Sequence, residues 1–356
     1  MQLVKYLADN KYESVHFFVD TRSGLRCIVA VHDTTLGPAL GGTRMWPYPT
    51  EEDALVDVLR LGKAMTYKAS AAGLHFGGGK AVIIGDPHKD KSEALFRAYG
   101  CSVNTMGGKY ITAEDVGIEP KDLEIVAQET RWCYGKPVDK GGSGDSAPAT
   151  GFGVYRGMKA CAKEVYGDES LKGRVVALQG FGKVASNLAP YLVEEGARLV
   201  VTDVYAGAKE VAFKSFGARI VETEEIYDVE CDIFSPCALG GVLNSRTIPR
   251  LKAKIVAGCA NNQLLEDIDG DRLQWRGILY APDFVINAGG LINLSFEAKR
   301  YDREVAMEKV GKIHETIQKV ISIAKSEGIT TAKAADWLAE HRLETARRPR
   351  ARELAR

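Results

Sequence analysis

The spacing of hydrophobic and polar residues changes along the chain and predicts two α/β regions. Residues 26–32 (RCIVAVH) and 81–85 (AVIIG) predict strands, because both are rich in β-branched residues and end at polar or glycine positions. Residues 51–65 predict a helix, since small and apolar side chains recur there at helical spacing. Farther along, strand-like runs recur with helical segments or loops between most of them: 175–180, 198–203, 218–221, 231–237, 254–260 and 277–282. This alternation predicts βαβ units and a doubly wound parallel sheet.

A stretch rich in glycine, serine and proline, DKGGSGDSAPAT (139–150), predicts the boundary between the two regions. We therefore expect a first domain over residues 1–140, a second over 141–330 and a C-terminal helix with a basic tail over 331–356. Gly328 is a candidate stop for the helical segment 303–326, and Thr330 or Thr331 a candidate cap for the last helix.

One glycine-rich turn in the second region has the spacing of a dinucleotide-binding site. The residues Gly180, Phe181, Gly182, Lys183, Val184 and Ala185 form G-x-G-x-x-A between a strand and a helical pattern. Asp203, at the end of the next strand, is placed to bind both ribose hydroxyls of NAD and to repel the 2′-phosphate of NADP. The sequence thus favours a Rossmann domain that binds NAD over a glycine turn without a cofactor. Pro190 falls inside the predicted helix, where it is expected to bend the chain.

Composition excludes several classes of function. Lys+Arg and Asp+Glu both total 47, so net charge indicates neither nucleic acid nor a membrane surface as partner. The seven cysteines form no C-x-x-C pair, so no metal site or disulfide framework is predicted. No apolar run is long enough to span a membrane and no signal-peptide profile is present, which favours the cytoplasm. The cluster of Arg347, Arg348, Arg350, Arg352 and Arg356 is interpreted as a frayed, solvated tail.

The first region holds three residues with possible catalytic chemistry. Lys68 ends a mostly apolar helix, and Lys80 follows three glycines and precedes an apolar strand, so burial of either would lower its pKa. Asp115 lies in ITAEDVG, between short apolar residues and a glycine. The alternative for Lys68 and Lys80 is that each side chain simply extends to solvent. The alternative for Asp115 is an ordinary loop aspartate, and Glu114 beside it is chemically as suitable. The six histidines show no paired motif, and no G-x-S-x-G is present.

Long motifs resemble the glutamate/leucine/phenylalanine/valine dehydrogenase superfamily between about residue 10 and residue 343. They are HDTTLGPALGGTRMWPY (32–48), GKAMTYKASAAGLHFGGGKAVIIGDP (62–87), YITAEDVG (110–117), GFGKVA (180–185), CDIFSPCALGG (231–241), GCANNQL (258–264) and YAPDFVINAGGLIN (280–293). The resemblance implies an N-terminal α/β substrate and assembly domain, a Rossmann domain, an active-site cleft between them, and C-terminal helices that return to the first domain. It also implies a homo-oligomer, commonly an octamer at this length.

The resemblance assigns a role to each matching position. Lys80 and Asp115 match the catalytic lysine and the acid/base residue, and Lys68 matches the lysine that binds the substrate carboxylate, helped by Gly41 and Gly42. Asn262 matches a further substrate contact. The loops expected to line NAD contain Thr150, Cys237, Ala238, Ala260, Asn261 and Asn287. The side-chain pocket maps to Leu40, Ala113, Leu291 and Leu294, all apolar.

These matches imply NAD-dependent, reversible oxidative deamination of an apolar L-amino acid to its 2-oxo acid and ammonia. Ala113 followed by Glu114 favours leucine and other branched-chain substrates. GGGK (77–80) and Leu291 instead favour phenylalanine or another aromatic amino acid, which remains the alternative. A different class of function, an NAD-binding regulator without catalysis, is disfavoured because Lys68, Lys80 and Asp115 are all present.

Overall fold

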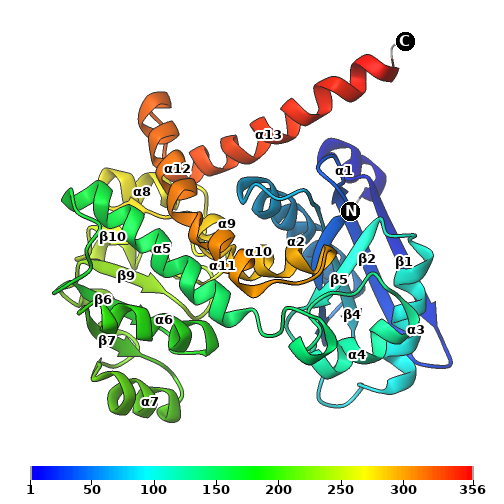
Figure 1. The fold of residues 1–356 in the computed structure, drawn as a ribbon, viewed down its shortest axis with the longest axis horizontal. Helices are drawn as coiled ribbons and strands as arrows, with labels where there is room; N and C mark the ends of the chain where they lie inside the picture. The colour runs from blue at the N-terminus through cyan, green and yellow to red at the C-terminus, as the bar shows by residue number, and fades with distance from the viewer. Residues whose placement is uncertain (1, 355–356) are drawn as a thin grey trace. The chain divides into compact units, whose positions relative to one another are not determined.

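The chain forms two compact units (Figure 1). The computed structural model describes the backbone of residues 2–354 and the side chains of residues 2–347. The first unit contains the described residues up to Asp145, the segment Leu294–Asp302 and the residues from Ala339 onward. The second unit contains Ser146–Asn293 and Arg303–Leu338.

The short segment Leu294–Asp302 differs from the predicted division, which placed it in the second domain. Its anchor is Glu297, whose Oε1 accepts hydrogen bonds from the backbone N–H groups of Gly135 (2.9 Å) and Ser143 (2.6 Å). These two bonds connect the segment to a loop of the first unit. Hydrophobic periodicity carries no signal for a contact of this kind, which joins residues more than 150 positions apart.

The C-terminal helix α13 (Thr331–Leu354) joins the first unit from Ala339 onward. Ser70 Oγ donates a hydrogen bond to the carbonyl oxygen of Ala339 (2.8 Å), and Arg347 forms an ion pair with the buried Asp33. The predicted frayed tail is therefore wrong for Arg347, because a buried carboxylate holds its guanidinium group. The side chains of the remaining tail arginines lie outside the described residues: Arg348, Arg350, Arg352 and Arg356.

A mixed five-stranded sheet forms the centre of the first unit, in the order β1-β2-β4-β3-β5. Strands β1, β2 and β4 pair antiparallel, whereas β4, β3 and β5 run parallel. The strands are β1 (Ser14–Asp20), β2 (Leu25–Asp33), β3 (Ala39–Trp46), β4 (Gly77–Ile84) and β5 (Tyr110–Glu114). The helices are α1 (Leu3–Asp9), α2 (Glu51–Ala71), α3 (Glu93–Thr105) and α4 (Pro120–Glu129). The two predicted strands and the predicted helix of this region are all present, as β2, β4 and α2.

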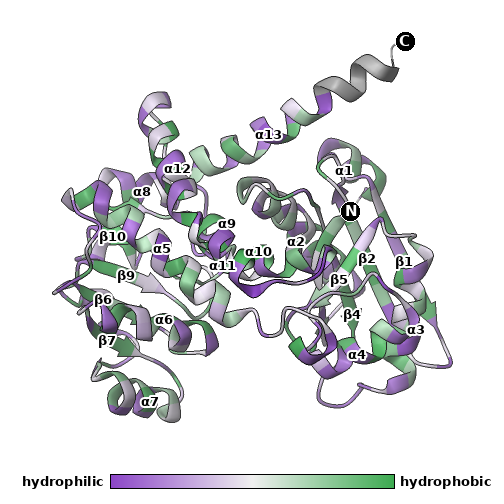
Figure 2. Ribbon diagram, in the orientation of Figure 1, coloured by the Kyte–Doolittle hydropathy of each residue, from purple (hydrophilic) through white to green (hydrophobic). Residues whose placement is uncertain are grey.

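Both faces of this sheet are buried, which explains the unbroken apolar runs of its central strands. Along β2, Val29 and Val31 pack in one hydrophobic cluster, while Ile28 and Ala30 pack in another. Helices α3 and α4 contribute to the first cluster and α2 to the second. Hydrophobic residues accordingly follow the sheet strands in Figure 2.

Helix α2 approaches strand β4 so closely that one strand residue has no room for a side chain. A Cβ atom on Gly78 would lie only 2.0 Å from the backbone nitrogen of Thr66. The helix begins at Thr50, whose side chain accepts a hydrogen bond from the Asp53 N–H and so satisfies one of the free donors at this end. Contact with Gly78 fixes the far half of α2, which carries Lys68, against the sheet.

A parallel six-stranded sheet forms the centre of the second unit, in the order β11-β10-β9-β6-β7-β8. Strand β6 comes first in the chain, with the next two strands on one side of it and the last three on the other. This confirms the predicted doubly wound Rossmann sheet, in which ligands bind where the strand order reverses, here beside β6 and β9. The strands are β6 (Val175–Gln179), β7 (Arg198–Thr202), β8 (Arg219–Ile220), β9 (Ile233–Pro236), β10 (Ile255–Val256) and β11 (Leu279–Tyr280).

The helices of the second unit follow the prediction with two differences. Pro190 lies within α6, yet the helix runs from Lys183 to Glu194 without a break. The helical segment predicted over 303–326 is divided at Lys312 into α11 and α12, and Gly328 caps α12 with a left-handed φ of 66°. The helices are α5 (Ala147–Tyr166), α6 (Lys183–Glu194), α7 (Ala206–Phe216), α8 (Ile268–Trp275), α9 (Asp283–Ile286), α10 (Gly289–Ser295), α11 (Arg303–Gly311) and α12 (Ile313–Glu327).

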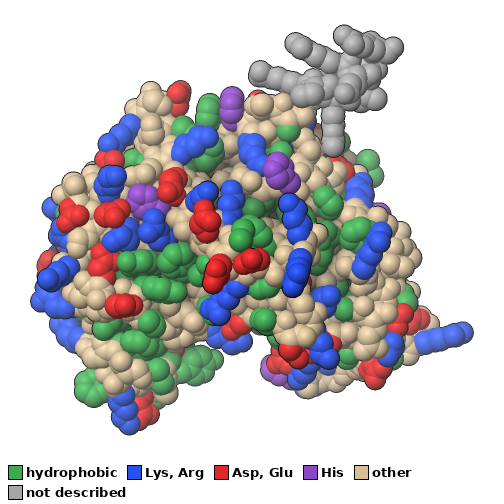
Figure 3. All heavy atoms as spheres, in the orientation of Figure 1, with side chains coloured by type: hydrophobic (Ala, Val, Ile, Leu, Met, Phe, Trp, Pro, Cys, Tyr) green, Lys and Arg blue, Asp and Glu red, His purple; other side chains and the backbone are tan. Residues whose placement is uncertain are grey.

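Charged side chains of both signs are interspersed on the face shown in Figure 3, in keeping with equal totals of 47 acidic and 47 basic residues. Within the described part of the chain, no helix combines the length and apolarity needed to cross a membrane.

Gly78→Ala is expected to destabilise the protein strongly, because its new methyl group would meet helix backbone at 2.0 Å. Overpacking typically costs about 1–3 kcal/mol and occasionally more, and a contact with helix backbone belongs at the upper end of this range. Gly207→Ala is the matched control: a Cβ on this exposed glycine of α7 meets nothing within 4 Å. Urea denaturation should show a large loss of unfolding free energy for the first variant and none for the second. Equal stabilities would refute the close approach of α2 and β4.

Candidate active site

An ion pair between the buried Lys80 and the partly exposed Asp115 is the central charged feature of the candidate site. Lys80 lies on β4 with only 6% of its side chain exposed, and its Nζ is 3.2 Å from Asp115 Oδ2. The same oxygen accepts a hydrogen bond from Arg44 Nε at 3.0 Å. The three residues come from neighbouring parallel strands, with Asp115 directly after β5. A buried ammonium group requires a counter-charge, and Asp115 supplies it.

Arg44 connects this pair to a second carboxylate, that of Asp57. The sequence analysis identified neither Arg44 nor Asp57 as a site residue. Arg44 NH1 is 2.9 Å from Asp57 Oδ2, which also accepts a hydrogen bond from Tyr48 Oη at 2.7 Å. The available signal was the position of Arg44, directly after the glycine-rich passage GPALGGT (37–43). Arg44 and Asp115 are 71 residues apart, so only the strand order reveals that they touch.

The two cations that face Asp115 outweigh the effect of its burial. Burial by itself raises the pKa of Asp115, but the Lys80 ammonium and the Arg44 guanidinium together hold that pKa below its usual value. Asp115 is therefore a carboxylate at neutral pH, able to accept a proton.

Two glycines keep the backbone beside the ion pair free of side chains. A Cβ atom on Gly41 would lie 1.9 Å from the carbonyl oxygen of Gly79. One on Gly42 would lie 2.1 Å from the carbonyl oxygen of Glu114 and 3.0 Å from Asp115 Cβ. Strand β3 thus approaches both of its neighbours here, and no larger residue fits.

The remaining predicted residues of the first unit lie on β3, β5, α2 and the segment Leu294–Asp302. Leu40 and Ala113 are buried on β3 and β5, and Ala113 pairs with Gly42 across the two strands. Lys68 is half-buried in the last turn of α2, two residues after Thr66, which contacts β4. Leu294 is half-buried at the start of the segment anchored by Glu297.

The second unit contains the glycine turn, between β6 and α6. Gly180 has a φ of 101°, which favours glycine, and a Cβ there would lie 2.7 Å from Ala238 Cβ. A Cβ on Gly182 would meet nothing within 4 Å, so space lies open above the turn. The first helical hydrogen bond of α6 runs from Ser186 N to Gly182 O (2.9 Å). The N–H groups of Gly182, Lys183 and Val184 precede that bond and form an anion-binding helix start.

Asp203 follows the last residue of β7 and supports the same turn. Its Oδ2 accepts a hydrogen bond from Phe181 N (2.7 Å) and its Oδ1 one from Tyr205 N (2.8 Å). A carboxylate has about four acceptor positions, so roughly two remain for ribose hydroxyls. The Phe181 ring itself is buried and packs edge-on against Phe216. These features fit a dinucleotide.

Asn287 connects the other predicted cofactor residues of the second unit. Its Nδ2 donates to the carbonyl oxygens of Cys259 (3.0 Å) and Ala260 (3.4 Å) and to Asn261 Oδ1 (2.9 Å). Its Oδ1 is buried and has no hydrogen-bond partner in the described structure. A buried amide oxygen without a donor is uncommon in proteins, and a ligand that donates a hydrogen bond would satisfy it.

The structure places three further predicted residues in the second unit. Thr150 lies in α5 beside Gly290, where a Cβ would come 2.9 Å from Thr150 Oγ1. Leu291 is nearly buried on α10. Asn262 is exposed and has a left-handed φ of 51°. The predicted substrate residues are therefore divided between the units, with Asn262 and Leu291 in the second and the others in the first.

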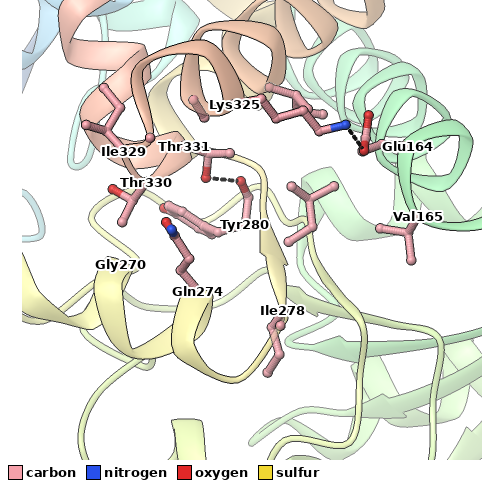
Figure 4. Close-up of a pocket in the computed structure, with 15 residues that line it drawn as sticks. Glu164, Val165, Gly270, Gln274, Ile278, Tyr280, Lys325, Ile329, Thr330 and Thr331 are labelled. Carbon is pink, nitrogen blue, oxygen red and sulfur yellow. Dashed lines mark hydrogen bonds and ion pairs between the residues drawn. The ribbon is translucent and has the colours of Figure 1, made fainter.

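A separate cavity of about 420 Å³ lies in the second unit beside the edge strand β11 (Figure 4). Ile278, Tyr280 and Ile329 contribute to its wall, and Thr331 Oγ1 donates to the Tyr280 carbonyl oxygen (2.6 Å). None of the predicted site residues lines it. The candidate site is thus distinct from this cavity.

Two family models cover most of the chain. Residues 10–132 match the Glu/Leu/Phe/Val dehydrogenase dimerisation domain. Residues 141–208 and 201–350 match the Glutamate/Leucine/Phenylalanine/Valine dehydrogenase model.

Individual relatives match over nearly the whole chain. Leucine dehydrogenase of Geobacillus stearothermophilus is 56% identical over 98% of this chain and 95% of its own length. Phenylalanine dehydrogenase of Caldalkalibacillus thermarum is 46% identical over 97% of this chain and 94% of its own. The crystal structure of L-tryptophan dehydrogenase from Nostoc punctiforme superposes with a TM-score of 0.84 at 44% identity, over 97% of this chain and 99% of that one. The chain therefore belongs to the Glu/Leu/Phe/Val dehydrogenase family of NAD(P)-dependent enzymes and is an amino-acid dehydrogenase.

Proposed function

We propose that the protein catalyses the NAD⁺-dependent, reversible oxidative deamination of leucine and related branched-chain L-amino acids. In the forward direction the amino acid, NAD⁺ and water yield the 2-oxo acid, ammonium, NADH and a proton. The Lys80–Asp115 pair, set among glycines in a member of this dehydrogenase family, is the observation that carries the proposal.

Lys80 and Asp115 divide the proton chemistry between them. As a carboxylate, Asp115 accepts a proton from the substrate ammonium group and later returns it to the departing ammonia. Lys80 donates a hydrogen bond to the oxygen of the water that attacks the imine carbon and stabilises the carbonyl oxygen as it develops. Arg44 keeps Asp115 in place and charged.

Lys68 binds the α-carboxylate of the substrate, helped by the glycines Gly41 and Gly42, which let β3 pack close to both neighbouring strands. Leu40, Ala113, Leu291 and Leu294 form the apolar pocket for its side chain, with Asn262 as a further substrate contact. Lys68 stands in the last turn of α2, where the helix dipole favours a cation.

NAD⁺ supplies the hydride acceptor when it is bound. The open helix start at Gly182, Lys183 and Val184 would hold its pyrophosphate, and Gly180 and Phe181 the turn beneath it. Asp203 would bind the ribose hydroxyls and repel a 2′-phosphate. The residues proposed to line the rest of the cofactor are Thr150, Cys237, Ala238, Ala260, Asn261 and Asn287.

The motif GGGK (77–80) favoured an aromatic substrate in the sequence analysis, but its third glycine also has a structural explanation. A Cβ atom on Gly79, the third glycine of GGGK, would lie 2.8 Å from the Ala30 carbonyl oxygen and 3.1 Å from the Tyr110 ring. Close packing around β4 thus favours glycine at this position for a reason that does not depend on the substrate. The higher identity to leucine dehydrogenase (56%) than to phenylalanine dehydrogenase (46%) points the same way.

We also propose a homo-oligomer, with the octamer implied by family resemblance as its specific form. The description of the model that matches residues 10–132 as a dimerisation domain supports assembly.

The first expected outcome is selective NADH production with leucine. Purified protein is assayed with twenty L-amino acids and NAD⁺, and leucine should have the highest kcat/KM. NADP⁺ should support far lower turnover, and Asp203→Ala should narrow this difference by removing the repulsive carboxylate. A preference for phenylalanine would refute the leucine assignment. Equal kcat/KM with both cofactors would refute the role of Asp203.

The second prediction concerns the ion pair between Lys80 and Asp115. Lys80→Ala and Asp115→Asn should each lower kcat by a factor on the order of 10² or more, since each removes a group that handles protons. The control is Lys91→Ala, which breaks a different Lys–Asp pair of the same unit, formed by the partly exposed Lys91 with the buried Asp122 at 2.5 Å. The control should lose stability and keep its kcat. Near-native kcat in either site variant would exclude that residue from the mechanism.

The third prediction concerns selectivity for the side chain of the substrate. Ala113→Gly/Leu291→Val removes two small groups from the proposed pocket, which should favour a benzyl side chain and weaken contact with an isobutyl one. Each buried CH₂ group contributes about 0.8 kcal/mol, so the phenylalanine-to-leucine ratio of kcat/KM should rise roughly tenfold. Ala177→Gly, in the buried centre of β6, should leave the ratio unchanged. A flat ratio in the double variant would show that these residues do not line the pocket.

A further inference from the structure

Two cysteines lie side by side where strands β9 and β10 end. Cys237 follows the last residue of β9, and Cys259 lies shortly after β10. The two strands are parallel neighbours, and the thiol of Cys259 is 3.9 Å from the carbonyl oxygen of Cys237. Adjacent strands are about 4.8 Å apart, which falls within the Cα separation that a disulfide spans.

The two thiols are chemically unequal. The Cys259 thiol donates a hydrogen bond to Cys237 Sγ, which lowers the pKa of Cys237 against the opposing effect of its burial, and the Ser235 hydroxyl at 3.3 Å acts in the same direction. The same bond, together with burial, raises the pKa of Cys259. Both side chains are partly exposed. Cys237 is thus the thiol that ionises first and attacks first.

The other cysteines do not combine partial exposure with a neighbouring thiol and a lowered pKa. Cys27, Cys133 and Cys161 are buried, and burial raises the pKa of Cys133 and Cys161 to about 12. Burial also raises the pKa of the half-buried Cys231 to about 12. Burial and the neighbouring Glu129 raise the pKa of the exposed Cys101.

We propose that Cys237 and Cys259 are a site of reversible oxidative modification, at which a low-molecular-weight disulfide converts the two thiols into an intramolecular disulfide. The Cys237 thiolate attacks one sulfur of the small disulfide, forms a mixed disulfide and releases one thiolate. The Cys259 thiolate then attacks Cys237 Sγ, the intramolecular bond forms and the second small thiolate leaves. Two protein thiols are oxidised, one disulfide is reduced to two thiols, and the released protons go to solvent or to the departing thiolates.

This bond would lie within the proposed dinucleotide site, so its effect on cofactor binding rests on the proposed function. The residue after Cys237 is Ala238, which packs directly beneath Gly180. The carbonyl oxygen of Cys259 accepts a hydrogen bond from Asn287. An S–S bond of about 2.05 Å would remove the contact of the Cys259 thiol with the Cys237 carbonyl oxygen and tie the two loops together. We therefore expect the oxidised protein to bind NADH more weakly.

The test of the modification uses full-length reduced protein treated with glutathione disulfide, followed by digestion without reductant and mass spectrometry. A peptide linked through Cys237 and Cys259 is expected. Cys259→Ser should stop at the mixed disulfide on Cys237, and Cys237→Ser should leave Cys259 unmodified. Cys231→Ser, which alters a nearby thiol outside the pair, should still form the link. Absence of the linked peptide, or modification confined to Cys101, would overturn the proposal.

The consequence is measured by titrating NADH fluorescence before and after oxidation of each protein. The Kd of the native chain should rise by about tenfold, a change of roughly 1.4 kcal/mol, and recover with dithiothreitol. The Kd of Cys237→Ser should be the same before and after treatment. A linked peptide with unchanged NADH affinity would refute regulation at this site. Leucine turnover by the reduced protein tests the proposed function separately, because mapping the disulfide requires no activity.

Discussion

A lysine ammonium inside a protein is stable only beside a compensating charge, and this requirement organises the first unit around Lys80. Asp115 provides that charge from the end of β5, two strands away from the strand that carries Lys80. The strand between them, β3, can approach both neighbours because it carries Gly41 and Gly42. The glycines and the ion pair therefore depend on each other, because the close approach of the strands brings the two charges together.

The charges around Asp115 bear on the kind of substrate that the site suits. Lys80 and Arg44 face the carboxylates of Asp115 and Asp57, and the largely exposed Arg60 is a further cation 3.2 Å from Asp57. An amino-acid zwitterion brings one carboxylate and one ammonium group, so it adds no net charge, and Lys68 is the cation proposed to bind its carboxylate. A substrate with a second carboxylate would need a further cation, since an unpaired buried charge is costly. The apolar Leu40 and Ala113 provide none. The apolar character of Leu40 and Ala113 thus agrees with an apolar amino acid as substrate.

Features with a local cause were predictable from sequence, and features with a distant cause were not. The strands β2 and β6, the glycine turn at Gly180 and the Gly328 helix stop each depend on residues close in the chain, and the structure contains all of them. By contrast, Arg44 is defined by partners on other elements, and no periodicity predicts them. Catalytic roles at Lys80 and Asp115 came from family resemblance, since pattern alone left ordinary surface lysines and a loop aspartate open.

Close packing at the end of β9 illustrates how one local arrangement acquires several roles. Glycine is favoured at position 180 because Ala238 occupies the space where a side chain would lie. This contact also positions Cys237, the residue before Ala238, at the end of β9. The neighbouring strand β10 runs beside β9, and Cys259, three residues after β10, contacts Cys237. Asn287 holds that second loop through its Nδ2 while its Oδ1 stays free for a ligand. The contacts around the proposed dinucleotide site therefore also bring two thiols together, so the proposed disulfide would act on the backbone proposed to bind the cofactor.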